Sequence, residues 1–313
     1  MTVVPTAIRI GARGSALSRR QAEQVARLIG LRYPQATVTI EPIVTKGDRV
    51  LETPLPLLGG KGAFTEEIEA ALLDGRIELA VHSLKDLPTR MAPGLVIGAV
   101  LPRSDPSDVL ISRSGRLLRE LPEGAVVGTS SLRRSAQLKR ERPELETRSI
   151  RGNVDTRLRK LHDPDGPYDA ILLARAGLER LGLLDSQAEV LPLDVMLPAP
   201  GQGALAVQCR DDPAIRDIAS SLNDEATALV VTAERAFLSG LGGGCSAPVA
   251  AYGWLEGGEL RLHGRVVSLD GGKCVDVQLS SAARDVADAD QVGRRAADQA
   301  LAEGAATILE AVK

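Results

Sequence analysis

Residues 128–134 combine hydroxyl side chains with two arginines at the expected start of a helix. The first turn of a helix carries unpaired N–H groups and the positive end of the helix dipole, so it attracts anions. Ser130 or Ser131 could simply cap the helix. Arg133 and Arg134, however, oppose the dipole at this position, which favours the binding of an anionic ligand over capping alone.

Further arginines stand where strands of an α/β sheet are expected to end. Arg151 ends an apparent strand, Gly152 after it permits close approach of the backbone, and Arg157 lies about one turn into the next helix. Arg13 has the equivalent place in the first half of the chain. Ligands of open α/β sheets bind at the carboxyl ends of strands. Each arginine alone is explained by a solvated surface, but together they favour a shared anion-binding cleft.

Lys85 and Asp86 follow an expected strand in a tight turn. A carboxylate at such a position can stabilise a developing cation or transfer a proton. A surface ion pair of negligible energy explains the same two residues. The preceding His82 is equally explained as a hydrogen-bonded core residue. The segment alone favours these structural interpretations.

The cysteines point to one candidate for covalent chemistry. Three glycines precede Cys245, and their uncluttered backbone beside a thiol suits the attachment of a bulky group. A small buried side chain in a turn explains the same pattern. Cys209 and Cys274 lie in apolar, strand-like segments and are expected to be buried. The odd number and wide spacing of the cysteines argue against a disulfide framework and against a metal site.

The composition restricts the class of partner. Only seven of the 38 basic residues are lysine, so 31 are arginine, the residue whose planar fork matches a carboxylate. High-GC codon bias explains this excess equally well, so position must decide. A net charge of -3 and 2% aromatic residues argue against nucleic acid and anionic membranes as partners. With no secretory signal and no membrane-length apolar run, the chain is expected to be cytoplasmic.

The first two thirds of the chain alternate short apolar runs with helical patterns, which is typical of α/β domains. The segment 46–62 is rich in glycine and proline and is expected to be a long loop. It lacks the spacing of a phosphate-binding loop, so nucleotide chemistry is not predicted. A linker near residues 101–106 precedes a second α/β pattern, and residues 197–201 are expected to cross back. From residue 224 the pattern predicts helices packed on three antiparallel strands.

The ordered set of motifs resembles the porphobilinogen deaminase family. The matching segments span nearly the whole chain: residues 10–15, 45–48, 60–62, 81–86, 128–134, 151–158, 197–204 and 241–245. Each motif alone is modest, but their order makes the set specific.

The resemblance implies an α/β fold with two type II periplasmic-binding-protein-like domains around a central cleft. A smaller C-terminal α+β domain with an antiparallel three-stranded sheet would follow. Domain 1 would comprise residues 1–101 with 202–222, domain 2 residues 106–197, and domain 3 residues 224–313.

The resemblance also implies the activity. The enzyme would condense four porphobilinogen molecules head to tail, releasing ammonia, and then free linear hydroxymethylbilane by hydrolysis. It would build on a dipyrromethane cofactor joined by a thioether to Cys245. It would act as a cytoplasmic monomer on this small-molecule substrate, with no metal, nucleic acid or membrane involved.

Roles for individual residues follow from the same resemblance. Asp86 would be the catalytic residue, stabilising the cationic pyrrole nitrogens. The cofactor would be held by Lys85, Asp86, Thr129, Ser130, Ser131, Arg133, Arg134 and Arg157, with Asp86 facing its pyrrole nitrogens and the others its carboxylates. Substrate carboxylates would be held by Arg13, Ser15, Arg151, Arg157 and Arg180. The loop with Asp48, Lys61 and Phe64 would be a lid over the site.

A competing hypothesis is a non-catalytic periplasmic-binding-protein-like module for a polycarboxylate ligand. It explains the arginines and the two connecting segments equally well. It does not explain a cysteine after three glycines in a third domain, and an exported binding protein normally carries a signal sequence.

Overall fold

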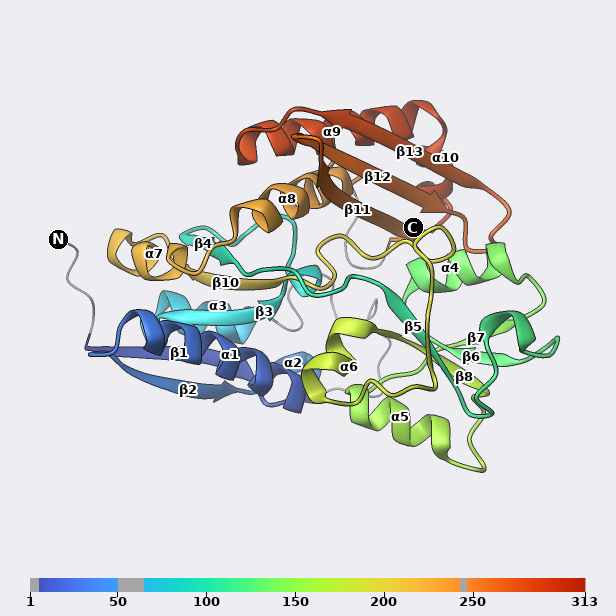
Figure 1. Ribbon diagram of the computed structural model, residues 1–313, viewed down its shortest axis with the longest axis horizontal. Coiled ribbons are helices and arrows are strands. Elements are labelled where there is room, and N and C mark those ends of the chain that lie inside the picture. The colour runs from blue at the N-terminus through green and yellow to red at the C-terminus, as the bar shows by residue number, and fades with distance from the viewer. Residues whose placement is uncertain (1–5, 50–64, 243–246, 313) are drawn as a thin grey trace. The chain divides into compact units, whose positions relative to one another are not determined.

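The computed structural model describes residues 6–49, 65–242 and 247–312, with only the backbone for residues 48 and 49 (Figure 1). The chain divides into two compact units. Unit 1 comprises residues 1–103 and 204–228, and unit 2 comprises residues 104–203 and 229–313. Among the described residues, no helix is long and apolar enough to cross a membrane.

Unit 1 contains a five-stranded sheet in the order β2-β1-β3-β10-β4. The bounds are β1 Ala7–Arg13, β2 Thr37–Ile43, β3 Leu79–Ser83, β4 Leu95–Val100 and β10 Leu205–Arg210. β1 runs parallel to β2 and β3, whereas β10 is antiparallel to β3 and β4. The returning chain is therefore an internal strand of this sheet, so unit 1 cannot be completed without residues after 203.

Helices cover both faces of this sheet. The helical segments along this part of the chain are α1 Ala16–Arg32, α2 Lys46–Arg49, α3 Glu66–Leu73, the short 3-10 helix η2 Leu84–Asp86 and α7 Pro213–Ser220. α1 begins directly after its cap Ser15, whose side chain accepts a hydrogen bond from Ser18 N at 3.2 Å. α1 and α7 pack on one face of the sheet, and α3 packs on the other. The first four residues of the expected long loop form α2 instead.

The second five-stranded sheet lies in unit 2 and has the order β7-β6-β8-β5-β9. Its strands are β5 Asp108–Ser112, β6 Val126–Gly128, β7 Glu146–Arg148, β8 Ala170–Ala174 and β9 Ala188–Val190. β5 is antiparallel to β8 and lies between β8 and the edge strand β9. In the first sheet, β10 lies in the same way between β3 and the edge strand β4. The two sheets thus share one topology, which confirms the predicted type II periplasmic-binding-protein-like fold class.

The helices of this second domain are η3 Leu118–Glu120, α4 Leu132–Glu141, α5 Val154–His162 and α6 Arg175–Leu181. α4 packs on one face of the sheet, through Leu138. α5 and α6 pack on the other, through Leu161 and Leu178.

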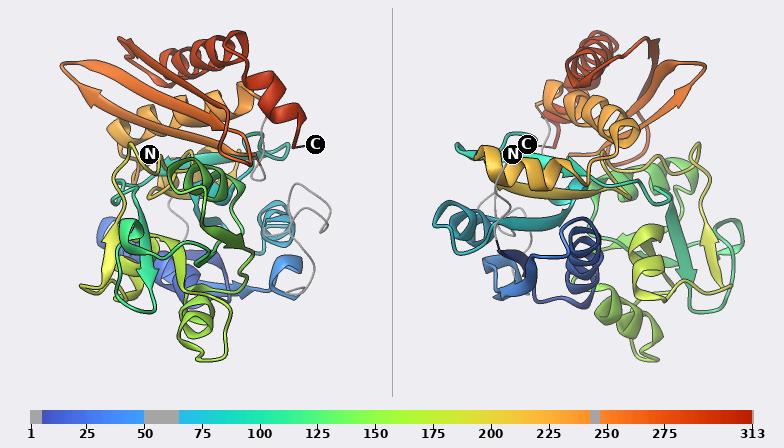
Figure 2. Two further views of the ribbon diagram at one scale, coloured as in Figure 1. Left: turned by 90° about the vertical axis from the view of Figure 1, so that its right-hand side faces the viewer. Right: turned by 60° about the vertical axis from the view of Figure 1, so that its left-hand side comes forward.

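The C-terminal part of the chain is α+β, as predicted. Its antiparallel sheet consists of β11 Val249–Glu256, β12 Glu259–Val267 and β13 Cys274–Ser281. Helices α8 Glu225–Gly240, α9 Val286–Ala302 and α10 Ala305–Glu310 cover one face of it (Figure 2). α8 and α9 cross so closely that a Cβ on Gly293 would lie 2.2 Å from the carbonyl oxygen of Ala233.

Three sheets occupy the ranges in which three domains were expected, but the second and third sheets belong to one compact unit. Hydrogen bonds connect the C-terminal sheet to the segment that follows β9. Ala251 N on β11 donates to Pro198 O at 3.0 Å, and Arg265 Nη1 on β12 donates to Asp194 O at 2.7 Å. The Gly271 turn also packs against the backbone of Arg140 in α4. The C-terminal sheet is therefore bonded both to α4 and to the crossing segment that follows β9.

Candidate functional site

Asp86 lies at the carboxyl end of β3, in the 3-10 helix η2. The buried Leu84 anchors this turn, and its N–H donates to Ala204 O at 3.0 Å at the start of the returning segment. Asp86 is exposed and Lys85 is half-buried. Leu84 thus holds the turn in place, and the carboxylate of Asp86 remains accessible to a ligand. A group that stabilises developing charge has to be fixed in position before the reaction.

Arg13 lies at the same edge of the sheet. It is the last residue of β1, which runs parallel to β3, so the two carboxyl ends meet at one edge. Arg13 N donates to Ser18 Oγ at 3.0 Å, and Ser15 caps α1. Arg13, Ser15, Lys85 and Asp86 therefore belong to one sheet edge in unit 1. The capping bond also gives Ser15 a structural role there.

Two buried polar residues beside this edge were not predicted to take part in the site. Gln21 Nε2 on α1 donates to Ser83 Oγ at 2.9 Å and so ties the helix to the end of β3. A glutamine inside an amphipathic helix belongs to no motif, so the sequence gives no signal for it. His82 is buried, which lowers its pKa to about 4 and keeps it neutral. His82 is therefore a core residue, but the expected hydrogen bonding is incomplete, because its buried Nε2 has no partner among the described residues.

In unit 2, the hydroxyls of the 129–131 turn are engaged locally. Thr129 Oγ1 accepts from Ser131 N at 3.2 Å, and Ser131 Oγ accepts from Arg134 N at 3.4 Å as the cap of α4. Ser130 Oγ donates to Ile150 O at 2.7 Å. These bonds shape the turn, so capping and turn formation account for the hydroxyls in this geometry.

Arg133 and Arg134 are buried, contrary to the sequence-based picture of two guanidinium groups facing ligand carboxylates. Their exposed fractions are 4% and 6%, and both pair with Asp108, which is fully buried. Arg133 Nη1 donates to Asp108 Oδ2 at 2.7 Å and to Leu197 O at 2.8 Å. A buried guanidinium requires a paired charge, and Asp108 supplies it to both arginines.

Each guanidinium nitrogen of Arg134 donates one hydrogen bond within the protein. Its Nε and Nη2 donate to Asp108 Oδ1 at 3.2 and 2.7 Å, and its Nη1 donates to Leu172 O at 3.0 Å. Arg133 differs, because its Nε is buried without a partner and its Nη2 has no bond to any described residue. The Nε–Nη2 edge of a guanidinium is a bidentate donor for a carboxylate. Arg133 can therefore bind an anion while it remains paired with Asp108.

The remaining predicted arginines of unit 2 fall into two groups. Arg151 directly precedes Gly152, whose φ of +114° is readily adopted only by glycine. Arg157, in the first part of α5, donates from Nε to Gly152 O at 2.8 Å. Strand β7 ends at Arg148, so Arg151 lies in the loop before α5 and not at the strand end as expected. Arg180 Nη2 instead donates to Ser104 Oγ and Gly203 O, at 3.1 and 2.6 Å. Arg180 therefore connects the segment after β4, which contains Ser104, to the segment before β10, which contains Gly203.

Several predicted residues lie outside the part of the chain that the structure describes. These are Cys245, Lys61, Phe64 and the side chain of Asp48. Of the other two cysteines, Cys209 is buried as expected, whereas Cys274 is only half-buried. Burial raises the pKa of both Cys209 and Cys274 to about 11, so neither is a thiolate near neutral pH. Among the described residues there is no cluster of side chains that could hold a metal ion.

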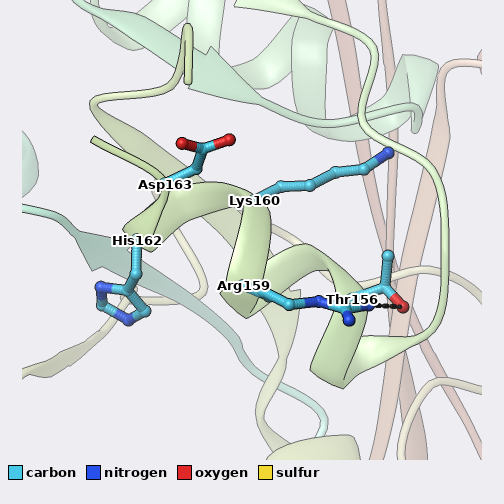
Figure 3. Close-up of a pocket in the computed structure, with 5 residues that line it drawn as sticks. All are labelled: Thr156, Arg159, Lys160, His162 and Asp163. Atoms are coloured by element: carbon cyan, nitrogen blue, oxygen red, sulfur yellow. Dashed lines mark hydrogen bonds between the residues drawn. The ribbon is translucent and has the colours of Figure 1, made fainter. Parts of the chain in front are cut away.

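A surface hollow of about 520 Å³ lies elsewhere, beside α5 (Figure 3). Its described lining is Thr156, Arg159, Lys160, His162 and Asp163. Figure 3 shows Arg159 reaching back to Thr156, with 3.3 Å between Nη2 and Oγ1. None of the predicted site residues is part of this lining, and four of its five residues are exposed. The hollow nevertheless adjoins predicted site residues, because Lys160 Nζ donates to Arg151 O at 3.1 Å.

Comparison with known proteins identifies the family. Residues 8–217 match the family model for "Porphobilinogen deaminase, dipyromethane cofactor binding domain", and residues 228–302 match the model for the C-terminal domain of porphobilinogen deaminase. The chain belongs to the porphobilinogen deaminase family. Two of its relatives carry that name. The protein of Syntrophotalea carbinolica is 47% identical over 98% of this chain and 96% of the relative. That of Geobacillus kaustophilus is 48% identical over 97% of each.

The residues of unit 2 fit the dipyrromethane cofactor of this family. Dipyrromethane carries several carboxylates, and the unpartnered Nε of Arg133 is a buried donor that lacks an acceptor. A buried donor without a partner is rare in native proteins and is consistent with a ligand oxygen in the complete molecule. Arg133 is therefore suited to one cofactor carboxylate. Arg134 and Arg180 make hydrogen bonds within the protein through part of their donors.

Proposed function

We propose that this chain joins four molecules of porphobilinogen head to tail, with loss of ammonia at each step, and then hydrolyses the product to linear hydroxymethylbilane. The observation that carries the proposal is the family match over both the cofactor-binding and the C-terminal domains. The exposed Asp86 at a sheet edge next to Arg13 supports it chemically. The competing hypothesis of a binding module does not account for the match to the C-terminal domain.

The cofactor would be attached through Cys245, and when bound it supplies the pyrrole position to which the first substrate is joined. The protein's own part is to hold carboxylates and to stabilise positive charge. Arg133 would hold one cofactor carboxylate through its Nε–Nη2 edge. Lys85, Arg151 and Arg157 are further candidates, with the hydroxyls of Thr129, Ser130 and Ser131 shaping the turn beside Arg133.

Asp86 would be the catalytic group. As the carbon–nitrogen bond to ammonia breaks, positive charge spreads over the pyrrole ring of the incoming substrate. A fixed carboxylate near the pyrrole N–H stabilises that charge, and it is most effective where the site excludes water. Arg13 and Ser15 at the same edge would orient the acetate and propionate of that substrate. Asp48, Lys61 and Phe64 would belong to the lid that excludes water.

We also infer that the protein acts as a cytoplasmic monomer without nucleic-acid or membrane partners. Its net charge of -3 and its 2% aromatic residues support this, because neither favours binding to polyanions. Light scattering on a size-exclusion column would test the oligomeric state, and a dimer mass at micromolar concentration would contradict it.

Product stoichiometry tests the proposed reaction. Purified protein is incubated with porphobilinogen, and ammonia and hydroxymethylbilane are both quantified. The proposal predicts four molecules of ammonia for each hydroxymethylbilane. Binding of porphobilinogen without release of ammonia would instead support the binding-module hypothesis.

A further inference from the structure

Arg265 lies on the face of the C-terminal sheet opposite its helices. Along β12, Leu260, Leu262 and Val266 point into the core formed with α8 and α9. Because successive side chains of a strand point to opposite faces of the sheet, Arg265 points away from this core. Its side chain is nevertheless only 12% exposed. Another part of unit 2 therefore packs against it.

The guanidinium group of Arg265 joins two parts of unit 2. At one end, Nε donates to both carboxylate oxygens of Asp276, at 2.9 and 3.1 Å. Asp276 is the residue directly opposite on β13, so the two form a cross-strand pair. At the other end, Nη1 donates to Asp194 O at 2.7 Å and to Gln137 Oε1 at 3.3 Å. Asp194 lies in the segment after β9 and Gln137 in α4, so one side chain connects the C-terminal sheet to the second domain.

Asp276 holds the Nε end of this guanidinium group in place. Its carboxylate also contacts His263 Nε2 at 2.5 Å and accepts a hydrogen bond from Cys274 Sγ at 3.1 Å. Burial alone would raise the pKa of Asp276, but these contacts and the bonds from Arg265 outweigh burial and hold the pKa below its ordinary value. Asp276 is therefore ionised at neutral pH, which strengthens its hydrogen bonds to Arg265.

The acceptors at the Nη1 end are fixed as well. Gln137 is buried, and its side chain bonds the Leu197 peptide twice: Oε1 accepts from Leu197 N at 2.9 Å, and Nε2 donates to Leu197 O at 3.0 Å. In the same segment, Pro198 O accepts from Ala251 N on β11 at 3.0 Å. The C-terminal sheet is thus bonded to this segment at two points, and Arg265 supplies the one that involves a charged side chain.

The placement of the C-terminal sheet bears on the position of the cofactor. Cys245, the proposed attachment residue, precedes the first residue of β11 by four residues in the sequence. Four residues of extended chain span at most about 14 Å, so the position of β11 limits where the cofactor can be attached. Candidates for holding its carboxylates, such as Arg133, belong instead to α4 and the neighbouring loops. A shift of the sheet against α4 would therefore displace the reactive pyrrole.

We infer that Arg265 is a positioning residue for the proposed reaction, which holds the C-terminal sheet, and with it the attached cofactor, in one register against α4. The inference rests on the proposed function and deepens it. Because Arg265 acts through the placement of the cofactor, its loss lowers kcat and leaves KM for porphobilinogen unchanged. Asp276 acts through Arg265.

The first test compares Arg265→Gln with Arg261→Gln. Arg261 lies on the same strand and the same face and pairs with Glu256 at 2.9 Å, but among the described residues it has no bond outside the C-terminal sheet. Each purified protein is incubated with porphobilinogen. Circular dichroism gives the folded fraction and intact mass the cofactor-loaded fraction, and kcat is expressed per folded, loaded molecule.

For R265Q we expect kcat to fall roughly tenfold with KM within about twofold, because a small misplacement of reacting groups is costly. R261Q should stay within about twofold of the unaltered protein on both measures. A purely structural role would lower the folded fraction and leave kcat per loaded molecule unchanged, and that result would overturn the inference. A higher KM at unchanged kcat would overturn it too. An unaltered protein that never gains mass from porphobilinogen would show instead that the proposed function is wrong.

The second test uses Asp276→Asn, which covers the case in which R265Q does not fold. Asp276 is exposed and asparagine keeps its shape, so the variant should fold. Loss of the charge weakens the bond to Arg265, and kcat should fall by about two- to fivefold with KM unchanged. An unchanged kcat would contradict the role of the pair.

The double variant D276N/R265Q tests whether Asp276 acts through Arg265. Where both single variants fold, the double variant should turn over as fast as R265Q, because the bond between the two residues is already lost. A further fall in kcat equal to that of D276N alone would show that the two residues act independently, and would overturn the inference.

Discussion

The Asp86→Asn variant tests whether the carboxylate of Asp86 acts in catalysis without contributing to the stability of the fold. The substitution removes one negative charge and keeps the size and shape of the side chain. Asp86 is exposed at the end of η2, and the turn is held by the buried Leu84, not by the carboxylate. The free energy of unfolding should therefore change by less than about 0.5 kcal/mol, as for other surface substitutions. Turnover should fall by about 10²- to 10³-fold or more, the usual cost of losing a charge-stabilising group.

Two measurements on the same preparation decide this prediction. Release of ammonia from porphobilinogen gives kcat, and urea denaturation gives the free energy of unfolding. Asp74→Asn is the control, because Asp74 is also exposed and ends a helix in the same unit. It should leave both quantities unchanged. Near-normal kcat in D86N would refute the role of Asp86, and a loss of stability as large as the loss of activity would refute the separation.

Two further predictions concern positions beside the site. Gly152→Ala places a Cβ at a φ of +114° and 2.6 Å from Thr156 Cγ2, so thermal denaturation should show that the free energy of unfolding falls by about 1–3 kcal/mol. The control is Gly30→Ala in α1, which has open space around it and should not destabilise the protein. His82 has a pKa of about 4 when folded and a higher one when unfolded, so the unfolded chain binds more protons between these values. Stability should fall as pH falls from about 6.5 towards 4, and urea titrations should show a shallower fall for His82→Gln; an equal slope in both proteins would contradict this.

The sequence predicts the periodic elements of this fold well, because their signals are local. α1 begins directly after its cap Ser15, and Ala22, Val25 and Ile29 are buried at helical spacing, a pattern that can be read from the local sequence. The three alternating strands of the C-terminal sheet also lie where they are expected. The position of β10 as an internal strand of the first sheet depends instead on long-range pairing, for which the local pattern carries no signal.

The candidate site is predicted less completely, because its organisation depends on partners far apart in the chain. The residues 128–134 indicate two arginines at a helix start, but not that Asp108, 25 residues before Arg133, pairs with both. An acidic residue at the head of an apolar strand was the available signal for Asp108. Likewise, Arg180 is seen as a basic residue in a helix, and only the tertiary fold shows that it bonds Ser104 and Gly203.

The most direct test of the central claim is the intact mass of the protein purified from cells, beside its Cys245→Ser variant. Where the apoprotein accumulates, both are first incubated with porphobilinogen. The account predicts an added mass of two deaminated porphobilinogen units on the unaltered protein and the bare polypeptide mass for the variant. An unaltered protein that remains bare after incubation would contradict the account, and an addition that persists in the variant would contradict the assignment of Cys245.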